Sequence, residues 1–343
     1  MKERPKSNPA NRFEATRIEY LDETPGMANV EVVEDATREI LAHNNSPDVG
    51  FDWSVNPYRG CMHACAYCYA RPGHEYLGYG AGTDFDTRIV VKRDAPALLR
   101  KAFDRPSWKG ETLVFSGVTD CYQPLESRLQ LTRGCLEVCA EYRNPVGIIT
   151  KAPLIERDID VLQELTKNAR VRVHVSVPFW DPEHARAMEP FVATPQRRIQ
   201  TIERLAKAGI EVGVNVAPII PGLGDEDLAK VLKAAREAGA TRAIYVLLRL
   251  PGPVQQVFEE RLRKALPERA ERVLHRIRET RGGQLYDARF GVRGRGTGLY
   301  AQTIGNLFDM TARRLGFNMA CVGEEGPTTF RRPDRPGTQM KLL

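Results

Sequence analysis

The 343-residue sequence contains no run of about eighteen or more apolar residues, the length that a membrane-spanning helix requires. It therefore predicts a protein without a membrane span or a membrane partner. The first residues are charged and include proline, so no secretory signal is expected there. The seven cysteines are an odd number in a long chain, which argues against a disulfide framework. Together these absences indicate a reducing, cytoplasmic compartment.

A large excess of charge of either sign is also lacking. The chain has 50 Lys and Arg against 44 Asp and Glu, which gives a formal net charge of +6. This modest excess permits an anionic partner such as nucleic acid without requiring one. Hydrophobic residues make up 42% of the chain, which is enough for a sizeable core in one large α/β domain with tails.

Three of the cysteines lie close together: Cys61, Cys65 and Cys68 are separated by three residues and then by two. Soft thiolates in an uncharged, turn-forming segment suit iron–sulfur or zinc binding. Three ligands would leave one iron of a cubic 4Fe–4S cluster without a protein ligand, and an open iron is a site for chemistry. A structural zinc site would need a fourth ligand, for which His63 or His74 is available.

Apolar, β-branched segments recur along the chain, with amphipathic helical stretches between them. The expected strands are residues 53–55, 112–115, 146–150, 171–177, 210–216 and 242–248. Strands and helices that alternate at about thirty residues per unit predict βαβ repeats and a parallel sheet. The expected fold class is therefore α/β, an open, partial (β/α)6 barrel of the TIM type. We expect a polar N-terminal arm at 1–50, the barrel core at 51–253 and a helical C-terminal extension at 254–343.

Two of the expected helices have clear start and stop signals. Thr194 followed by Pro195 predicts a helix N-terminus, and Gly209 predicts the end of that helix. Asp225 is expected to cap the next helix, which would end at Gly239. Later in the chain, two basic helices are expected to be broken near residue 267.

The cysteine loop resembles the cluster loop of the radical S-adenosylmethionine (SAM) superfamily, in which CxxxCxxC with an aromatic residue before the last cysteine holds a 4Fe–4S cluster. Tyr67 occupies that aromatic position. Segments 119–126, 131–133 and 149–151 are similar to a group of DNA repair photolyase-like proteins, distant relatives of spore photoproduct lyase. The resemblance spans about residues 50–250, the expected barrel. It implies that Cys61, Cys65 and Cys68 hold the cluster and that SAM is the second cofactor.

The resemblance also implies a reaction. One electron from a donor of the flavodoxin or ferredoxin type would cleave SAM to a 5'-deoxyadenosyl radical that acts on the substrate. The substrate is not identified by the sequence, although the relationship to spore photoproduct lyase points to a nucleic-acid lesion. The alternative is a non-catalytic iron–sulfur or zinc-binding protein that uses the barrel as a scaffold.

Residues near the carboxyl ends of the expected strands are candidates for binding SAM, because βα loops converge there. Small residues after the second strand let the backbone approach a ligand closely, although the commoner Gly-Gly-Glu form is absent. The segment 218–225 resembles the superfamily's GxIxGxxE pattern, in which an apolar side chain packs against adenine. The candidates are Tyr67, Ser116, Gly117, Thr119, Asp120, Ser176, Ile220 and Gly222.

Cys121 is the candidate catalytic residue. Spore photoproduct lyase uses a cysteine in this general loop as a hydrogen donor, and a partly exposed thiol here could do the same, whereas a buried thiol would be inert. Cys135 and Cys139 share one helical stripe, which predicts core packing. Cys321 is isolated in the tail.

Two further sets of polar residues remain candidates for substrate binding. The first follows the second and third strands, where side chains are expected to face the barrel mouth; its members are Asp120, Gln123, Glu126 and Lys151. The second is the Gly- and Arg-rich loop at 291–298, which could grip phosphates or serve as a solvated, flexible connector. It lacks the Gly-Lys-Ser/Thr ending of a nucleotide P-loop.

Overall fold

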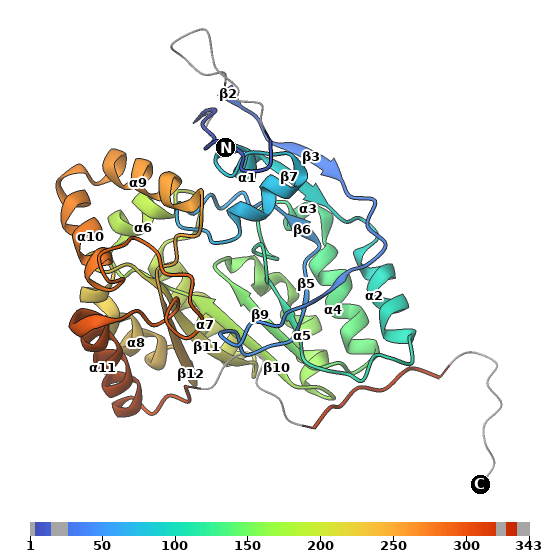
Figure 1. Cartoon of the computed structure of the whole chain (residues 1–343). Helices are drawn as coiled ribbons and strands as arrows, with labels where there is room; N and C mark the ends of the chain where they lie inside the picture. Colours follow the sequence, from blue (N-terminus) through green and yellow to red (C-terminus); the bar gives the residue numbers. More distant parts are fainter. Residues whose placement is uncertain (1–3, 15–26, 320–326, 335–343) are drawn as a thin grey trace.

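The computed structural model describes residues 4–14, 27–319 and 327–334, and a seven-stranded sheet forms its centre (Figure 1). The strand order is β12-β11-β10-β9-β8-β5-β4. Six strands run parallel: β5 (Trp53–Val55), β8 (Leu113–Phe115), β9 (Val146–Thr150), β10 (Val171–Ser176), β11 (Glu211–Ile219) and β12 (Arg242–Leu247). These are the six predicted strands. Since β12 and β4 are opposite edges of this sheet, the predicted open α/β fold is confirmed.

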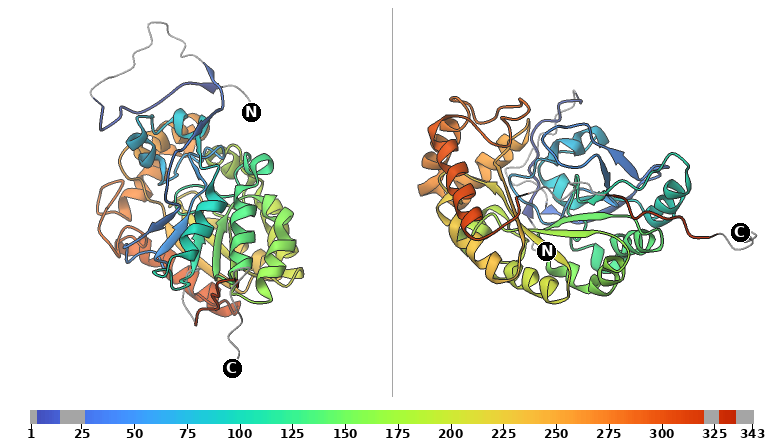
Figure 2. Two further views of the ribbon diagram at one scale, coloured as in Figure 1. Left: turned by 90° about the vertical axis from the view of Figure 1, so that its right-hand side faces the viewer. Right: turned by 90° about the horizontal axis from the view of Figure 1, so that it is seen from below.

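Helices cover the convex side of the curved sheet, and the segment that carries the cysteine loop lies within its arc (Figure 2). The helices between the parallel strands include α2 (Ala95–Asp104), α3 (Glu126–Leu129), α4 (Leu131–Glu141), α5 (Ile159–Thr166), α6 (Pro182–Met188), α7 (Pro195–Lys207) and α8 (Leu228–Glu237). A 3-10 helix, η2 (Pro153–Asp158), precedes α5. Because parallel strands all end at one edge, the loops that follow them gather there.

Helix α7 begins and ends where the sequence predicts. The Thr194 side chain accepts a hydrogen bond from the backbone N–H of Arg197, and Pro195 is the first helical residue. Gly209 follows the helix with φ +79°, a conformation that favours glycine.

The predicted cap of the next helix is wrong. Asp225 begins a 3-10 helix, η3 (Asp225–Asp227), and α8 starts only after it. The Asp225 carboxylate accepts a hydrogen bond from the backbone N–H of Gly222 at 2.8 Å and another from the Tyr300 hydroxyl. It therefore closes the turn after β11 and ties that turn to the C-terminal part of the chain. Gly239, with φ +99°, does follow α8 as predicted.

The N-terminal arm supplies strands to two sheets. Strand β4 (Leu41–His43) pairs antiparallel with β5, and β3 (Glu31–Glu34) pairs parallel with β7 (Arg88–Val91), which also pairs with β6 (Tyr58–Arg59). Two further strands, β1 (Arg4–Pro5) and β2 (Met27–Ala28), pair with each other. The described residues of the arm, 4–14 and 27–50, thus contribute extended segments to the fold.

In its described residues the C-terminal part forms the helices α9 (Val254–Ala265), α10 (Pro267–Glu279) and α11 (Gly298–Arg314), and the predicted break near residue 267 is confirmed. The Gly- and Arg-rich loop before α11 is held in place. Leu247 donates its backbone N–H to the Gly294 carbonyl at 2.9 Å, and the buried Arg281 donates to the carbonyls of Val292 and Arg293. The loop is thus docked on the end of β12 and is not the free connector that its composition suggested.

Two apolar clusters form most of the core. The larger one lies between the sheet and its helices and contains Cys135 and Cys139 without solvent exposure, so their predicted packing role is confirmed. The second packs Tyr67 and Cys65 against residues that follow β11 and β12. Cys321 lies outside the described residues. Within the described part of the chain, no helix is long and apolar enough to cross a bilayer.

The turn that enters the cysteine loop requires glycine. Gly60 has φ +79°, and a Cβ atom built there would lie 2.9 Å from the carbonyl oxygens of Phe85 and Arg88. We expect Gly60→Ala to lower the free energy of unfolding by about 1–3 kcal/mol more than Gly209→Ala, because Gly209 has the same φ but open space around it. Urea unfolding of both variants measures the difference, and equal losses would contradict the steric argument.

A buried histidine in the sheet predicts pH-dependent stability. Burial lowers the pKa of His174 from 6.5 to about 4, although Nδ1 contacts Asn215 Oδ1 at 2.6 Å. The unfolded chain therefore binds a proton at a higher pH than the folded chain, and stability falls as pH drops from about 6.5 towards 4. His174→Gln should remove about 2 kcal/mol of the stability difference between about pH 7.5 and pH 5, measured by urea unfolding. The exposed His275→Gln serves as the control and should leave that difference unchanged.

Candidate cluster and cofactor site

Cys61, Cys65 and Cys68 lie in the loop between β6 and a 3-10 helix, η1 (Arg71–Leu77). Cys61 and Cys65 are buried, Cys68 is partly buried, and all three are free thiols. Backbone N–H groups of Ala64 and Cys68 donate to the carbonyls of Cys61 and Cys65 at 3.2 and 3.3 Å, so two successive tight turns fold the loop back on itself. Each thiol lies within electrostatic range of the other two.

A buried arginine fixes the shape of this loop. The Arg71 side chain is 1% exposed and donates from Nε and Nη2 to the Cys65 carbonyl at 3.2 and 2.9 Å. Nη1 donates to the carbonyls of Ala81 and Gly82, and Nη2 also contacts the Asp86 carboxylate at 2.8 Å. The loop that carries the thiols is therefore tied to helix α1 (Thr83–Thr87) and to the turn before it.

The chemistry of the donor set fits a 4Fe–4S cluster. Burial raises the pKa of Cys65 well above its usual value and that of Cys68 to about 11, even with Arg71 near Cys68. Lys151 near Cys65 and Arg71 near Cys68 offset this burial only in part. Burial also opposes ionisation of Cys61, but nearby His63 lowers its pKa. A bound cluster iron would stabilise all three thiolates. No three His, Cys, Asp or Glu side chains of the described residues are grouped so as to hold a single metal ion. A cubane spaces its cysteine ligands more widely than one ion does.

The aromatic residue of the loop belongs to a buried polar network. The Tyr67 hydroxyl donates to the Glu189 carboxylate, to which the buried Arg198 also donates, and burial raises the Tyr67 pKa. The Ala66 N–H donates to the Met188 carbonyl at 3.0 Å and so holds the loop against helix α6. Sequence reasoning missed Glu189 and Arg198 because Glu189 is 122 residues from Tyr67, and nothing in the local sequence indicates this contact.

Lys151, directly after β9, lies within electrostatic range of the Cys65 thiol. Its Nζ lies 5.9 Å from the centroid of the Tyr67 ring. Burial would lower the pKa of Lys151, but nearby Cys65 and Glu189 raise it, so the partly buried amine is a cation. No carboxylate of the described residues forms an ion pair with Lys151 within 4.0 Å, so the amine is available to an incoming anion.

Asp120 and Thr119 hold neighbouring loops together. The Asp120 carboxylate accepts hydrogen bonds from the Thr150 hydroxyl at 2.7 Å and from the Lys151 N–H at 2.8 Å. Burial opposes its ionisation, but nearby His63 and these bonds lower its pKa to about 2. Thr119 donates its hydroxyl to the Gly60 carbonyl at 2.7 Å. The structure thus brings both residues to the cysteine loop, where their side chains are already engaged.

Ser116 and Gly117 form the bend that follows β8. Ser116 has φ +81°, and its hydroxyl accepts a hydrogen bond from the Cys121 N–H at 3.0 Å. A Cβ at Gly117 would lie 3.0 Å from Ser54 Oγ, and the Gly117 carbonyl accepts from the Tyr69 hydroxyl at 2.8 Å. This bend is therefore in direct contact with the residue that follows Cys68.

The remaining SAM candidates lie at the ends of β10 and β11. Ser176 ends β10 and is buried. Ile220 is fully buried in the same apolar cluster as Tyr67, and Gly222 turns the chain with φ +80°. The structure brings Ile220 and the cysteine loop to one apolar wall, while the SAM contacts of all these residues stay predictions.

Cys121 and Glu126 lie in the protein interior and do not reach the open end of the barrel. Cys121 is fully buried, and burial raises the pKa of its thiol, which fits the packing alternative; its role as a hydrogen donor stays a prediction. Glu126 is also fully buried and accepts hydrogen bonds from the Tyr58 hydroxyl and from Arg157 Nη2, the latter at 2.8 Å. The expectation that Glu126 contacts substrate is wrong. Gln123 is buried too and donates to the Gly60 carbonyl at 3.2 Å.

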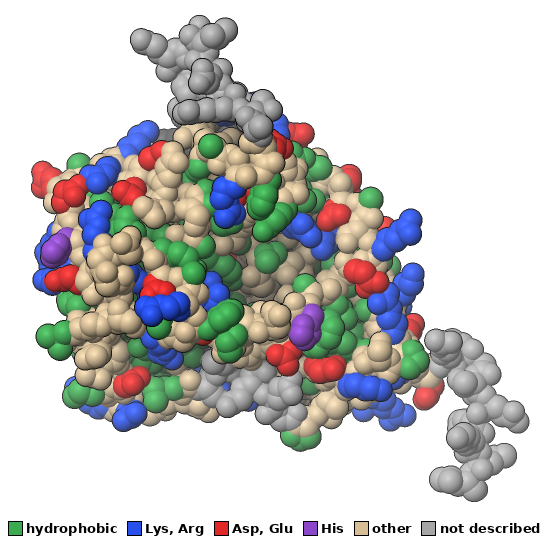
Figure 3. Space-filling model, viewed as in Figure 1, with side chains coloured by type: hydrophobic (Ala, Val, Ile, Leu, Met, Phe, Trp, Pro, Cys, Tyr) green, Lys and Arg blue, Asp and Glu red, His purple; other side chains and the backbone are tan. Residues whose placement is uncertain are grey.

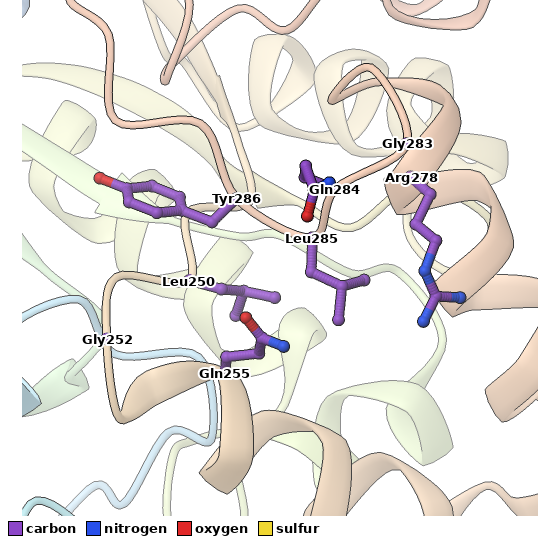
Figure 4. Close-up of a pocket in the computed structure, with 8 residues that line it drawn as sticks. All are labelled: Leu250, Gly252, Gln255, Arg278, Gly283, Gln284, Leu285 and Tyr286. Carbon is purple, nitrogen blue, oxygen red and sulfur yellow. The ribbon is translucent and has the colours of Figure 1, made fainter.

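A pocket of about 360 Å³ opens beside the end of β12, between α9, α10 and the loop that follows α10 (Figure 4). It is lined by Leu250, Gly252, Gln255, Arg278, Gly283, Gln284, Leu285 and Tyr286. None of these was a predicted site residue. The face of the molecule shown in Figure 3 is hollowed near its centre, with hydrophobic and basic side chains around the hollow.

Comparisons with known proteins agree with this geometry. A family model for the radical SAM superfamily matches residues 55–235. An uncharacterized protein of Mycobacterium tuberculosis is 41% identical over 230 residues, 66% of this chain and 68% of the relative. A radical SAM Nα-GlyT isomerase of Pseudomonas phage M6 is 24% identical over 232 residues, 67% of this chain and 46% of the relative.

Solved structures share the fold. A mutant of spore photoproduct lyase has a TM-score of 0.59 at 16% identity and covers 83% of this chain and 80% of its own. Another, with bound AdoMet and dinucleoside spore photoproduct, has a TM-score of 0.54 at 17% identity, over 83% of this chain and 77% of its own. The superfamily implies a 4Fe–4S cluster and SAM as cofactors. Because the family model matches more than half of the chain, this protein belongs to the radical SAM superfamily.

Proposed function

We propose that this protein is a radical SAM enzyme whose 4Fe–4S cluster is held by Cys61, Cys65 and Cys68 and whose substrate is a nucleic acid. The observation that supports the chemistry best is the buried three-thiol loop with the unpaired cation of Lys151 beside it. When bound, the cluster and SAM supply a one-electron cleavage that yields a 5'-deoxyadenosyl radical. The electron would come from a flavodoxin- or ferredoxin-type donor in the cytoplasm.

The residues of this chain would bind and orient SAM at the carboxyl edge of the sheet. Lys151 would pair with the SAM carboxylate, because its ammonium lies beside the Cys65 thiol. Ile220 and Tyr67 would form the apolar wall, and the small residues Ser116 and Gly117 would leave room for the backbone to approach the cofactor. Ser176 and the turn at Gly222 complete this edge. The enclosing apolar cluster would exclude water from the radical.

A nucleic-acid substrate is supported by two observations. The chain has a net charge of +6. One structural neighbour is spore photoproduct lyase with bound AdoMet and dinucleoside spore photoproduct. A non-catalytic metal-binding protein would not need the residues proposed above to bind SAM.

We assign the barrel to residues 51–253, with the arm at 1–50 and the extension at 254–343.

Cleavage of SAM should depend on the cysteine loop. Anaerobically reconstituted protein with dithionite and SAM should form 5'-deoxyadenosine, and Cys65→Ala should abolish this product because the cluster loses one of three ligands. Cys135→Ala is the matched control: this cysteine is equally buried but lies in α4, so product should persist. A loaded wild-type cluster that yields no 5'-deoxyadenosine, with or without added oligonucleotide, would favour the non-catalytic alternative.

Lys151 should contribute to SAM affinity. Lys151→Gln should weaken SAM binding about tenfold or more, because a charged hydrogen bond contributes about 1.5–3 kcal/mol. Equilibrium dialysis with the reconstituted protein measures this directly and does not require turnover. Lys92→Gln, which changes a buried lysine, is the control and should bind SAM as the wild type does. Unchanged affinity in Lys151→Gln would remove this residue from the cofactor site.

A further inference from the structure

Arg249 lies at the mouth without an assigned role. It follows the end of β12, and its Cζ atom lies 5.4 Å from the centroid of the Tyr69 ring. Tyr69 is the residue after Cys68, and its ring is 49% exposed. The hydroxyl of Tyr69 is fixed on the Gly117 carbonyl, so the ring has a defined orientation beside the cysteine loop. A guanidinium and an aromatic face thus stand together at the entrance to the site.

The Arg249 guanidinium has no carboxylate partner among the described residues, and its buried Nε has no hydrogen-bond acceptor there. Asp48 lies within electrostatic range, but it already binds Arg293 and the N–H of Gly291. The buried Arg281 adds a second positive charge nearby, since its guanidinium bonds only carbonyl oxygens, such as that of Leu248. Asp287 lies within electrostatic range of Arg281, but it is paired with Arg289. Neither Arg249 nor Arg281 therefore has a carboxylate of its own among the described residues, and an oxyanion would stabilise their positive charge.

Two further aromatic groups with guanidinium partners continue along the same rim. Arg293 lies over Phe290 at 4.4 Å, with the ring 59% exposed. Phe13 and Tyr76 are both exposed, with ring centroids 4.6 Å apart, and Arg12 lies 5.5 Å from the Phe13 ring.

Shared contacts connect both groups to Arg249. Arg293 binds Asp48, which is within range of Arg249. Arg12 reaches Gly252, three residues beyond Arg249, where a Cβ would lie 3.1 Å from Nη1. We call the three pairs Tyr69–Arg249, Phe290–Arg293 and Phe13–Tyr76 the aromatic rim.

We propose that the aromatic rim binds a single strand of nucleic acid, with a base stacked on Tyr69 and the adjacent phosphodiester held by Arg249. This rests on the nucleic-acid substrate proposed above and assigns its anchoring residues. Unpaired bases stack on exposed aromatic rings, and arginine pairs with phosphate oxygens through its planar fork. An acidic peptide would use the charge of the rim but not its rings, so the rings favour a nucleic acid. Anchoring beside Cys68 would bring the neighbouring nucleotide to the radical source.

The test is binding of fluorescein-labelled dodecathymidylate to the reconstituted holoenzyme, followed by fluorescence anisotropy at several salt concentrations. Arg249→Gln should weaken binding about tenfold. It should also make the salt slope, the slope of log binding constant against log salt concentration, less steep by about 0.7, the contribution of one phosphate contact with a single strand. Arg236→Gln is the matched control. Like Arg249→Gln, it removes one positive charge and one guanidinium that lies over an aromatic ring, here that of Phe317. Arg236 is near the end of α8, which leads into the start of β12, so it lies at the opposite edge of the sheet from Arg249. It should leave both quantities nearly unchanged.

The stacking step has its own variants. Tyr69→Leu should weaken binding about tenfold without changing the salt slope, whereas Tyr69→Phe should bind as the wild type does because it keeps the ring. Circular dichroism and cluster absorbance verify that each variant is folded and loaded. Equal binding by Arg249→Gln and Arg236→Gln would overturn the proposal.

Polyglutamate that displaces the oligonucleotide as well as unlabelled dodecathymidylate does would also overturn it, because a general anion surface needs no rings. The proposed radical chemistry is judged separately by 5'-deoxyadenosine formation in the same preparation. If the wild-type protein cleaves SAM but does not bind the oligonucleotide, only the proposed binding role of the aromatic rim is refuted. If it binds the oligonucleotide but does not cleave SAM at any oligonucleotide concentration, the result supports the binding role and counts against the enzymatic assignment.

Discussion

The cysteine loop keeps its shape because one buried cation, the Arg71 guanidinium, binds the Cys65 carbonyl, two further carbonyls and the Asp86 carboxylate. A charge at this depth is tolerated only when every donor finds a partner, so loop and helix α1 must fold together. The turn that follows is tied in the same way, since the buried Glu75 carboxylate accepts from Arg12 of the N-terminal arm. The arm is consequently part of the site's support, although it lies far from the cysteines in sequence.

The parallel sheet supplies the second constraint. Its strands end at one edge, so residues from the ends of β8, β9 and β12 meet around the cysteine loop although they are widely separated in the chain. Asp120 shows how tightly these loops are joined: it bonds to the residues that end β9 and begin the next loop. Such contacts fix the positions of Lys151 and Tyr69 relative to the thiols before any cofactor binds, which is the preorganisation that radical chemistry requires.

Features written in local sequence were predictable, and features that depend on distant partners were not. The six strands, the cysteine loop and the ends of α7 follow from periodicity and capping chemistry within a few residues. Asp225 looked like a helix cap, but its carboxylate is held by Tyr300, 75 residues away. Glu126 looked like a mouth residue, but Tyr58, 68 residues away, binds it in the core. The loop at 291–298 looked flexible because of its many glycines, and its composition does not indicate the backbone hydrogen bond from Leu247 that holds it in place.

The distribution of paired and unpaired cations separates structural from functional charge at this site. Arg71 and Arg198 are fully buried, and each has a carboxylate partner, Asp86 or Glu189. Lys151 and Arg249 have no carboxylate partner among the described residues, yet both lie beside the cysteine loop. Unpaired positive charge next to apolar walls is costly, and natural folds keep it where an anion regularly arrives. Both side chains are partly buried, but their aromatic neighbours differ. Lys151 lies over the buried Tyr67 ring, which suits a small cofactor carboxylate that is enclosed on binding, whereas Arg249 lies over the exposed Tyr69, which suits a phosphate that must enter and leave with a longer chain.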